Sequence, residues 1–410
     1  MRRIRVLGLA VLAACGGGNS TPDAVDARGD SPPARCEPLP AMGQFVRRQG
    51  NPRILAGATF GDGKLDLSMS DPDVRFDAAT GRYELYYSAG HAATFADPAD
   101  PVIRHATSLD HMTWTVDDAP VFTANPDPAA WDHLTSDAPS VAVNPDAPAE
   151  RRYLMLYAGA ARTLPGHTVP EYSIGAAFSA DGTTFTRVSA AESPHGQDGL
   201  VLTGLQTYPT AAGAIAADPE VTYVDGLYHL WFSSFACAGA GCTETTDLGI
   251  SHATSADGIT WTVLEAPVRS LLRASVDRKT GGHQPSVIHD AVHCRWELWL
   301  TSDLTGEPAN QPIELANMVG VYHAESDDGV TWHIVYTSPR DFAWTPAVPE
   351  PGEHLGLRTG ADIAQNSTGR LMLYVGFDDQ NVPAGAVLPD RTAGVRAGVM
   401  TLNVATRDLP

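Results

Sequence analysis

Short apolar runs and polar turns alternate along most of this chain with the spacing of β-hairpins. One run follows the phrase Asp71-Pro72-Asp73-Val74. A turn rich in Gly, Asn, Asp or Pro then separates it from a run dense in Tyr, Trp and Leu. β-branched and aromatic residues at strand spacing on both sides of a turn predict a hairpin. Related phrases begin at residues 138, 218, 284 and 360, so the hairpin recurs.

A second phrase follows the first four hairpins: SLDHMTW at 108–114, SADGTTF at 179–185, SADGITW at 255–261 and SDDGVTW at 326–332. Asp-Gly between two strand-like runs is a strong turn signal, because Asp bonds to local backbone and Gly accepts positive φ. The aspartates of the four copies are 71, 76 and 71 residues apart, and a fixed period indicates stacked copies of one unit. Two hairpins per copy give four strands, which is one propeller blade.

The predicted fold class is all-β, a five-bladed β-propeller with four antiparallel strands per blade. The two phrases place the blades at about residues 66–124, 135–204, 216–272, 282–341 and 358–410. The fifth copy lacks the second phrase, and its last clear strand is GVMTLNV. Within the segment 50–60, the sequence PRILAGA at 52–58 resembles the strand after the turn in other blades. We therefore expect this N-terminal segment to complete blade five, which removes exposed sheet edges.

The N-terminal residues have the composition of a targeting segment. A basic start and a short apolar core in residues 1–15 predict a signal peptide. The run Leu-Ala-Ala before Cys15 resembles a bacterial lipoprotein box, which implies lipidation of Cys15. Residues 16–49 are low in complexity and poor in large apolar residues, so we expect a disordered tether before the propeller of residues 50–410. The predicted location is the cell envelope, with the protein anchored by lipid.

Charge and cysteine content limit the partners. The net charge is −21 with only two lysines, whereas nucleic-acid binding needs basic clusters. We expect a monomer that does not bind nucleic acid. Cys237 and Cys242 flank a short loop and are candidates for a local disulfide in an exported protein, and Cys36 and Cys294 are then candidates for a second one. No spacing of Cys or His suggests a transition-metal site.

Acidic residues dominate the start of the inner strands, which line the channel of a propeller. In three consecutive blades these residues are Asp71, Asp73, Asp137, Asp218 and Glu220. Blade four has His283 and Gln284 there, and blade five has Asp362 near Arg358. Carboxyls crowded at one mouth repel, which raises at least one pKa and separates an acid from a base. Glycoside hydrolysis needs that division. The structural alternative is that some of these aspartates only form turns before proline.

Five blades, DPxV inner strands and SxDGxTW hairpins resemble the five-bladed propeller glycoside hydrolases of family 43, the arabinanases and β-xylosidases. The resemblance covers residues 50–410. It implies that Asp71 is the general base, that Glu220 is the general acid, and that Asp137 tunes the pKa of the acid and orients it. The match is offset, because Asp137 lies two residues before Pro139 and Glu220 follows Pro219. Such a slip can turn a side chain to the other face, so Asp73 and Asp218 are kept as alternatives.

The resemblance also implies secondary site residues. His283 lies where relatives carry a central histidine, sometimes beside a structural calcium ion; no other cofactor is expected. Trp131 lies in a loop that would form a wall of the pocket, where an aromatic face can stack on a sugar. Asp73, Asp218, Gln284, Arg358 and Asp362 complete the expected carbohydrate-binding set.

Three functions remain as hypotheses. The first is an inverting glycoside hydrolase that acts on a polysaccharide or oligosaccharide. The second is a sialidase, whose Asp box is one residue longer than the repeat here and whose arginine triad is not evident. The third is a non-catalytic surface propeller that binds glycan or a protein partner. Carboxyls that face one another across the channel favour a hydrolase, and carboxyls directed outward favour the binding module.

Overall fold

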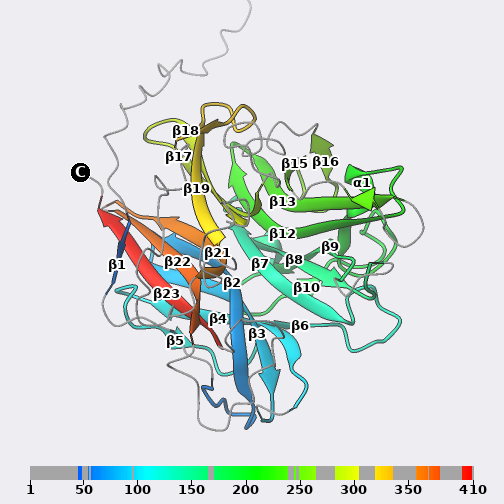
Figure 1. Ribbon diagram of the computed structural model, residues 1–410, viewed down its shortest axis with the longest axis horizontal. Coiled ribbons are helices and arrows are strands. Elements are labelled where there is room, and N and C mark those ends of the chain that lie inside the picture. Colours follow the sequence, from blue (N-terminus) through cyan, green and yellow to red (C-terminus); the bar gives the residue numbers. More distant parts are fainter. Residues whose placement is uncertain are drawn as a thin grey trace, which may run out of the picture. The chain divides into compact units, whose positions relative to one another are not determined.

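The computed structural model describes residues 45–48, 54, 57–94, 97–164, 170–238, 244–245, 249–264, 282–303, 319–335, 357–367, 369–378 and 399–408. Within these ranges the strands form five antiparallel sheets of four or five strands, and the helices are η1 (Ala149–Arg151) and α1 (Gly204–Thr207). The predicted five-bladed propeller is confirmed (Figure 1).

Each blade is a meander in which the inner strand comes first in sequence, except that blade five ends with an N-terminal strand. Blade one contains β2 (Leu65–Asp77), β3 (Arg82–Ala92), β4 (Asp100–Ser108) and β5 (Thr115–Val116), with β6 (Phe122–Thr123) on β4. Blade two contains β7 (Thr135–Val143), β8 (Tyr153–Ala160), β9 (Ser173–Ser179) and β10 (Thr186–Arg187), with β11 (Leu200–Thr203) on β9. Blade three contains β12 (Gly213–Val224), β13 (Leu227–Ala238), β15 (Gly249–Ser255) and β16 (Thr262–Leu264), with β14 (Glu244–Thr245) on β13.

The last two blades have four strands each. Blade four contains β17 (His283–Asp290), β18 (Arg295–Asp303), β19 (Val319–Ser326) and β20 (His333–Ile334). Blade five contains β21 (Leu357–Gln365), β22 (Gly369–Asp378), β23 (Val399–Asp408) and β1 (Val46–Arg47). Closure by an N-terminal strand is therefore confirmed, although β1 lies upstream of the predicted start at residue 50. From the predicted segment, Ile54 forms a bridge with Leu402 of β23.

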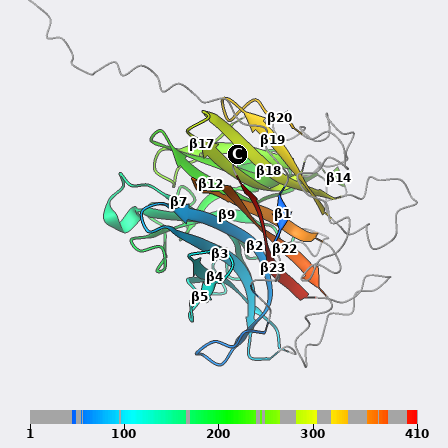
Figure 2. The ribbon, with the colours of Figure 1, turned by 90° about the vertical axis from the view of Figure 1, so that its left-hand side faces the viewer.

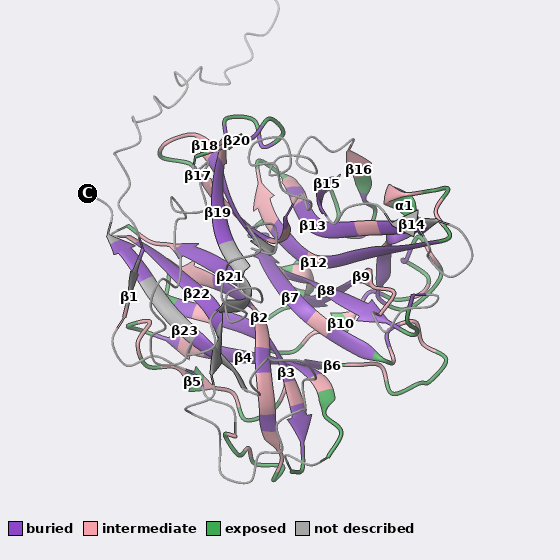
Figure 3. Ribbon diagram, viewed as in Figure 1, coloured by how far each residue is buried: buried purple, intermediate pink, exposed green. Residues whose placement is uncertain are grey.

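The blades are held together by apolar clusters, each shared by two neighbouring blades. One cluster joins Leu85 of blade one to Leu371 of blade five, and a second joins Ile103 of blade one to Met155 of blade two. Three more clusters join blades two and three, three and four, and four and five. The cycle closes, with the five sheets arranged around one axis (Figure 2). Buried residues dominate the strands and most exposed residues lie in the turns and loops (Figure 3).

The repeated SxDGxxW phrase forms the turns that the sequence predicts. In blade three, Oδ1 of Asp257 accepts hydrogen bonds from the backbone N–H groups of Ile259 and Thr260, each at 2.8 Å. Asp110, Asp181 and Asp328 accept the equivalent pairs in their own blades. Gly258 has a φ of 75°, which glycine adopts at no steric cost. These aspartates therefore stabilise the scaffold, and their role differs from that of the acidic residues of the channel.

Several expectations lie on residues outside the described ranges. These residues include the signal segment 1–15 with Cys15, most of the tether 16–49, Cys36 and Cys242. Both candidate disulfides include one such cysteine, so the two pairings stay predictions. Within the described residues, no helix is long and apolar enough to cross a membrane.

Candidate functional site

The proline phrase of each inner strand forms a β-bulge. The register of the β2–β3 pair shifts between Ser70 and Asp73, and the inner strands of blades two, three and four shift at the same place. The residue before the proline has positive φ, 48° at Asp71 and 47° at Asp218. Proline has no N–H for the ladder, and a bulge re-aims the side chains around it. Residues before and after the proline therefore reach different levels of the channel.

Residues directly after the proline, or after Ala361 in blade five, form a closed ring around the axis. Each accepts a hydrogen bond from the backbone N–H of the following blade. Val141 donates to Asp73 at 3.1 Å, and Val287 donates to Glu220 at 3.0 Å. The other three bonds run from Val221 to Ser140, from Ile363 to Ser286 and from Val74 to Asp362. We call Asp73, Ser140, Glu220, Ser286 and Asp362 the axial ring.

Two carboxyls of the ring share one serine hydroxyl. The hydroxyl oxygen of Ser140 lies 3.1 Å from Oδ1 of Asp73 and 3.2 Å from Oε2 of Glu220. A hydroxyl has one hydrogen to donate, so Ser140 cannot fully satisfy two ionised carboxylates. Burial raises the pKa of Asp73 well above its usual value, with a further contribution from Asp362. Burial also raises the pKa of Glu220, helped by the charges of Asp362 and Asp73.

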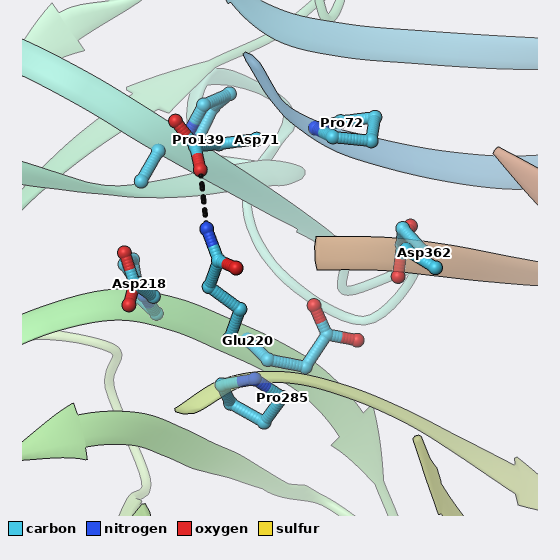
Figure 4. Close-up of a pocket in the computed structure, with 11 residues that line it drawn as sticks. Asp71, Pro72, Pro139, Asp218, Glu220, Pro285 and Asp362 are labelled. Carbon is cyan, nitrogen blue, oxygen red and sulfur yellow. Dashed lines mark hydrogen bonds between the residues drawn. The ribbon is translucent and has the colours of Figure 1, made fainter. Parts of the chain in front are cut away.

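Residues before the proline form a second acidic group at one mouth of the channel. Asp71 and Asp218 line a pocket there, and Nε2 of Gln284 donates a 2.9 Å hydrogen bond to Oδ1 of Asp71. Figure 4 shows Asp71 and Asp218 on one side of this pocket, with Glu220 and Asp362 of the axial ring on the other. Asp137 precedes the bulge of blade two and interacts electrostatically with both Asp71 and Asp218. We call Asp71, Asp137 and Asp218 the mouth aspartates.

The mouth aspartates repel one another in a poorly solvated position. Burial, and then the charge of Asp218, raises the pKa of Asp71 to about 6. Burial, and then the charge of Asp71, raises the pKa of Asp137 to about 7. Burial also raises the pKa of Asp218. All three remain partly exposed, whereas Asp73, Glu220 and Asp362 are buried. The mouth can therefore supply both a protonated and an ionised carboxyl near neutral pH.

The pocket at the mouth is small, and the axial ring forms its base. Its volume of about 30 Å³ is enough for one or two water molecules. Glu220 and Asp362 line this pocket, and both also line a cavity of about 310 Å³ at the other end of the channel, together with Asp73. The ring therefore lies between the two cavities.

The structure brings part of the predicted acidic set together at the mouth. Asp71, Asp218, Glu220 and Asp362 line the same pocket, whereas Asp73 lines the cavity at the other end of the channel. Both oxygens of Glu220 are engaged by Val287 and Ser140. The general-acid role of Glu220 stays a prediction.

The other predicted site residues do not all lie at the mouth. His283 precedes Gln284 at the start of β17, where its charge lowers the pKa of Asp71, and its Nδ1 lies 3.3 Å from Oγ1 of Thr301. Arg358 lies on β21, two residues before Gly360 of the fifth phrase. Trp131 does not line the pocket at the mouth; it lines a separate cavity beside blade two.

Sequence reasoning missed Tyr172 and the two ring serines. The Tyr172 hydroxyl donates a 3.2 Å hydrogen bond to Oδ2 of Asp137, which also accepts one of 3.0 Å from Thr135. Ser140 and Ser286 occupy the position of Asp73 in their own phrases, so aligning the five copies would have found them. Tyr172 carries no such repeat signal. Within the described ranges, no three His, Cys, Asp or Glu residues are arranged to hold a metal ion.

This chain is similar to known proteins in structure and not in sequence. No protein-family model matches this chain, and no curated protein matches its sequence. The structure of a BT0996 RGII complex is similar with a TM-score of 0.59 and 13% identity, and the match covers 88% of this chain and 92% of the other. A glycosyl hydrolase from Bacteroides ovatus has a TM-score of 0.55 and 14% identity, covering 92% and 99%.

A third similar structure is Zg3597, a family 117 glycoside hydrolase produced by the marine bacterium Zobellia galactanivorans. It has a TM-score of 0.51 and 14% identity, and the match covers 90% of this chain and 91% of the other. The chain shares their propeller fold. At these identities the likeness is one of fold, so function has to be inferred from the residues at the mouth of the channel.

Proposed function

We propose that the protein is a glycoside hydrolase that acts on an oligosaccharide or polysaccharide at the mouth of the propeller channel. The observation that carries the proposal is the group of three aspartates from neighbouring blades, partly exposed and with raised pKa values. Glycoside hydrolysis needs one carboxyl that holds a proton and one that is ionised. The fold of several glycoside hydrolases is the same, which is consistent with the proposal.

The pKa values of two mouth aspartates suggest their roles. The lower pKa belongs to Asp71, about 6, where Gln284 donates to the carboxylate, so Asp71 is the general base at neutral pH. The higher pKa belongs to Asp137, about 7, so Asp137 holds the proton and acts as general acid. Asp218 keeps both pKa values raised through its negative charge. The acid role moves from Glu220 to Asp137 because Glu220 belongs to the axial ring.

In this mechanism the leaving oxygen of the glycosidic bond takes the proton of Asp137 as the bond to the anomeric carbon breaks. A water molecule attacks that carbon and loses a proton to Asp71. The sugar leaves with inverted configuration, because one direct displacement occurs. Tyr172 and Thr135 hold the Asp137 carboxyl in place through their hydrogen bonds to its Oδ2 atom.

The test uses substrates with good and poor leaving groups. An acid variant, Asp137→Asn, should keep activity on dinitrophenyl glycosides, whose leaving group needs no proton, and lose it on natural glycans. A base variant, Asp71→Asn, should lose activity on both. Glu220→Gln should behave like wild type in the ratio of the two activities. Proton NMR of the first-formed anomer reports inversion or retention. If the wild-type chain has no turnover on any glycoside, the binding-module hypothesis replaces the hydrolase.

We further propose that the chain is a monomer attached to the cell envelope by lipid on Cys15. The basic and apolar residues before Cys15 support this location. In a bacterial host, wild type should fractionate with membranes and Cys15→Ala should be soluble. Equal membrane association of the two would contradict the anchor without affecting the proposed reaction.

A further inference from the structure

A second cavity, of about 370 Å³, lies beside blade two. Its walls come from the end of β8, the start of β9, the β11–α1 segment and Ala214 of blade three. The volume falls in the range of about 300–1,000 Å³ that is usual for ligand pockets. Trp131 lines it on one side, and Leu205 of α1, with 44% of its surface exposed, lines it on another. It is therefore large enough for a sugar ring.

The indole of Trp131 is held in one orientation. Its Nε1 donates a 2.8 Å hydrogen bond to the carbonyl of Asp198, and its ring stacks on Tyr157 with centroids 5.9 Å apart. A Cβ atom at Gly159 would lie 2.8 Å from the indole, so only glycine lets the ring lie against β8. The next residue, Asp132, is buried and accepts hydrogen bonds from Tyr157 and Arg187. A ring fixed in this way loses little entropy on binding.

Tyr172 joins this cavity to the mouth of the channel. Its neighbours Glu171 and Ser173 line the cavity, while its own hydroxyl bonds to Asp137. The cavity and the mouth aspartates therefore lie on either side of one residue. A glycan chain that presents a bond to Asp137 can place another of its sugars in the cavity.

The polar groups of the cavity suit a sugar with hydroxyl groups and no charge. Arg162 and Glu171 line it and pair at 2.6 Å, which sets a donor and an acceptor side by side. The three mouth aspartates and a net charge of −21 repel anionic chains. Aromatic faces pack against the apolar face of a sugar, and paired charged groups bond its hydroxyls.

We propose that the cavity is a distal subsite for a neutral polysaccharide, in which the indole of Trp131 stacks on one sugar while another sugar lies at the mouth aspartates. The proposal rests on the proposed function for the position of the cleaved bond, but it makes a binding claim that needs no turnover. It also gives the substrate a class, a chain of several uncharged sugars.

The test is affinity gel electrophoresis of the full chain in gels that contain arabinan, xylan, mannan or polygalacturonate. We expect at least one neutral polysaccharide to retard the wild-type chain and polygalacturonate not to do so. Trp131→Ala should raise the Kd for that polysaccharide by about tenfold, the usual effect of removing an aromatic anchor. Trp131→Phe should fall between the two, because it keeps an aromatic face.

Two leucines offer a matched pair of surface variants. Leu205→Ser removes an exposed apolar side chain from the cavity and should weaken binding. Leu109→Ser removes one that is 70% exposed in the first turn phrase, away from the cavity, and should not. Thermal unfolding monitored by circular dichroism checks that each variant is folded. If Trp131→Ala does not fold, the Leu205 and Leu109 pair decides the question.

The outcomes separate the subsite from the reaction. Binding that Trp131→Ala weakens, in a chain without turnover, supports the subsite and contradicts the hydrolase. Turnover with equal binding by wild type, Trp131→Ala and Leu205→Ser contradicts the subsite alone. Retardation by no neutral polysaccharide also contradicts the subsite, and stronger retardation by polygalacturonate contradicts the neutral class.

Discussion

The mouth aspartates and the axial ring are two sets of acidic residues on the same strands, and they differ in exposure and in their hydrogen-bond partners. In the ring, each carboxylate oxygen of Asp73, Glu220 and Asp362 has a hydrogen-bond partner from a neighbouring blade. At the mouth, Asp71 and Asp218 are partly exposed and face a pocket. One proline lies between the two positions, and the acids before it are partly exposed whereas those after it are buried.

The comparison teaches how a repeat protein can have both scaffold and site in one motif. The ring position is Asp, Ser, Glu, Ser and Asp around the axis, so every blade supplies an acceptor for the next. The position before the proline is Asp, Ala, Asp, Gln and Gly, which has no such regularity. The ring position is an acceptor in every blade, so it has the same structural role in each. The position before the proline varies from blade to blade, so it is free to take a functional role in some of them.

The largest effect expected from this comparison is on turnover. Asp71→Asn and Asp137→Asn should lower kcat by about 10²–10⁴, the usual contribution of a general base or acid. Their free energy of unfolding should not fall, because each substitution removes a carboxyl that is poorly solvated beside other acidic groups. Steady-state kinetics on a cleaved glycan and urea unfolding measure the two quantities. A large loss of stability in these variants would place the mouth aspartates with the ring.

The next effect is on stability. Asp362→Ala removes the acceptor for Val74 and Ser286 and leaves both buried, so the free energy of unfolding should fall by about 2–4 kcal/mol. Asp362→Asn keeps an acceptor and should lose less. The matched control is Asp218→Ala at the mouth, which should change stability by less than about 1 kcal/mol. Similar urea midpoints for Asp362→Ala and Asp218→Ala would remove the distinction between ring and mouth.

The third prediction concerns pH. Carboxyls with raised pKa in the folded state bind more protons than in the unfolded chain, so stability is highest at low pH and falls as pH rises. The window runs from about pH 4, the pKa of an unfolded-state aspartate, through the raised pKa values of about 6 for Asp71 and Asp362 and about 7 for Asp137.

The measurement is urea unfolding at pH 5, 6, 7 and 8. The wild-type chain should be most stable at pH 5, and Asp137→Asn should flatten the part of the curve around pH 7. Deprotonation of the ring should still lower stability in that variant, because burial raises the pKa of Asp73 and of Glu220. A wild-type stability that rises from pH 5 to pH 8 would contradict the raised pKa values of both sets.

The fold could be predicted from the sequence because its signals are local and repeated. The Asp257 turn and the hairpin after each proline phrase are determined by residues that are close together in the chain. The period follows from the repetition of these short stretches. Closure of blade five was also predictable, because the N-terminal segment resembles an outer strand, but its start was not. The strand Val46–Arg47 lies in a stretch whose composition is that of a tether.

The candidate site could be predicted only in part, because the bulge decides which level a side chain reaches. The sequence points to Asp71, Asp137 and Glu220 as one group, and it does not show that Glu220 belongs to the axial ring. Asp73 and Glu220 follow a proline, whereas Asp218 precedes one. The sequence shows this difference, but it does not show that the bulge places the two positions at different levels of the channel. Tyr172 escapes prediction because its contact with Asp137 depends on packing between strands that the sequence does not pair.

The smallest expected effect on stability is in the turn aspartates. They form a third set of acidic residues, besides the mouth aspartates and the axial ring. Backbone N–H groups hold the pKa of Asp257 below its usual value against an opposing effect of burial. A lowered folded pKa means that this contribution is present above about pH 4 and is lost as pH falls further. Asp257→Ala should lower the free energy of unfolding by about 1 kcal/mol at pH 7 and by less at pH 3. Asp257→Asn, which keeps the acceptor oxygen, should retain most of the stability at both. Urea unfolding at the two pH values measures this, and a loss that grows on acidification would show that the ionised carboxylate does not hold the turn.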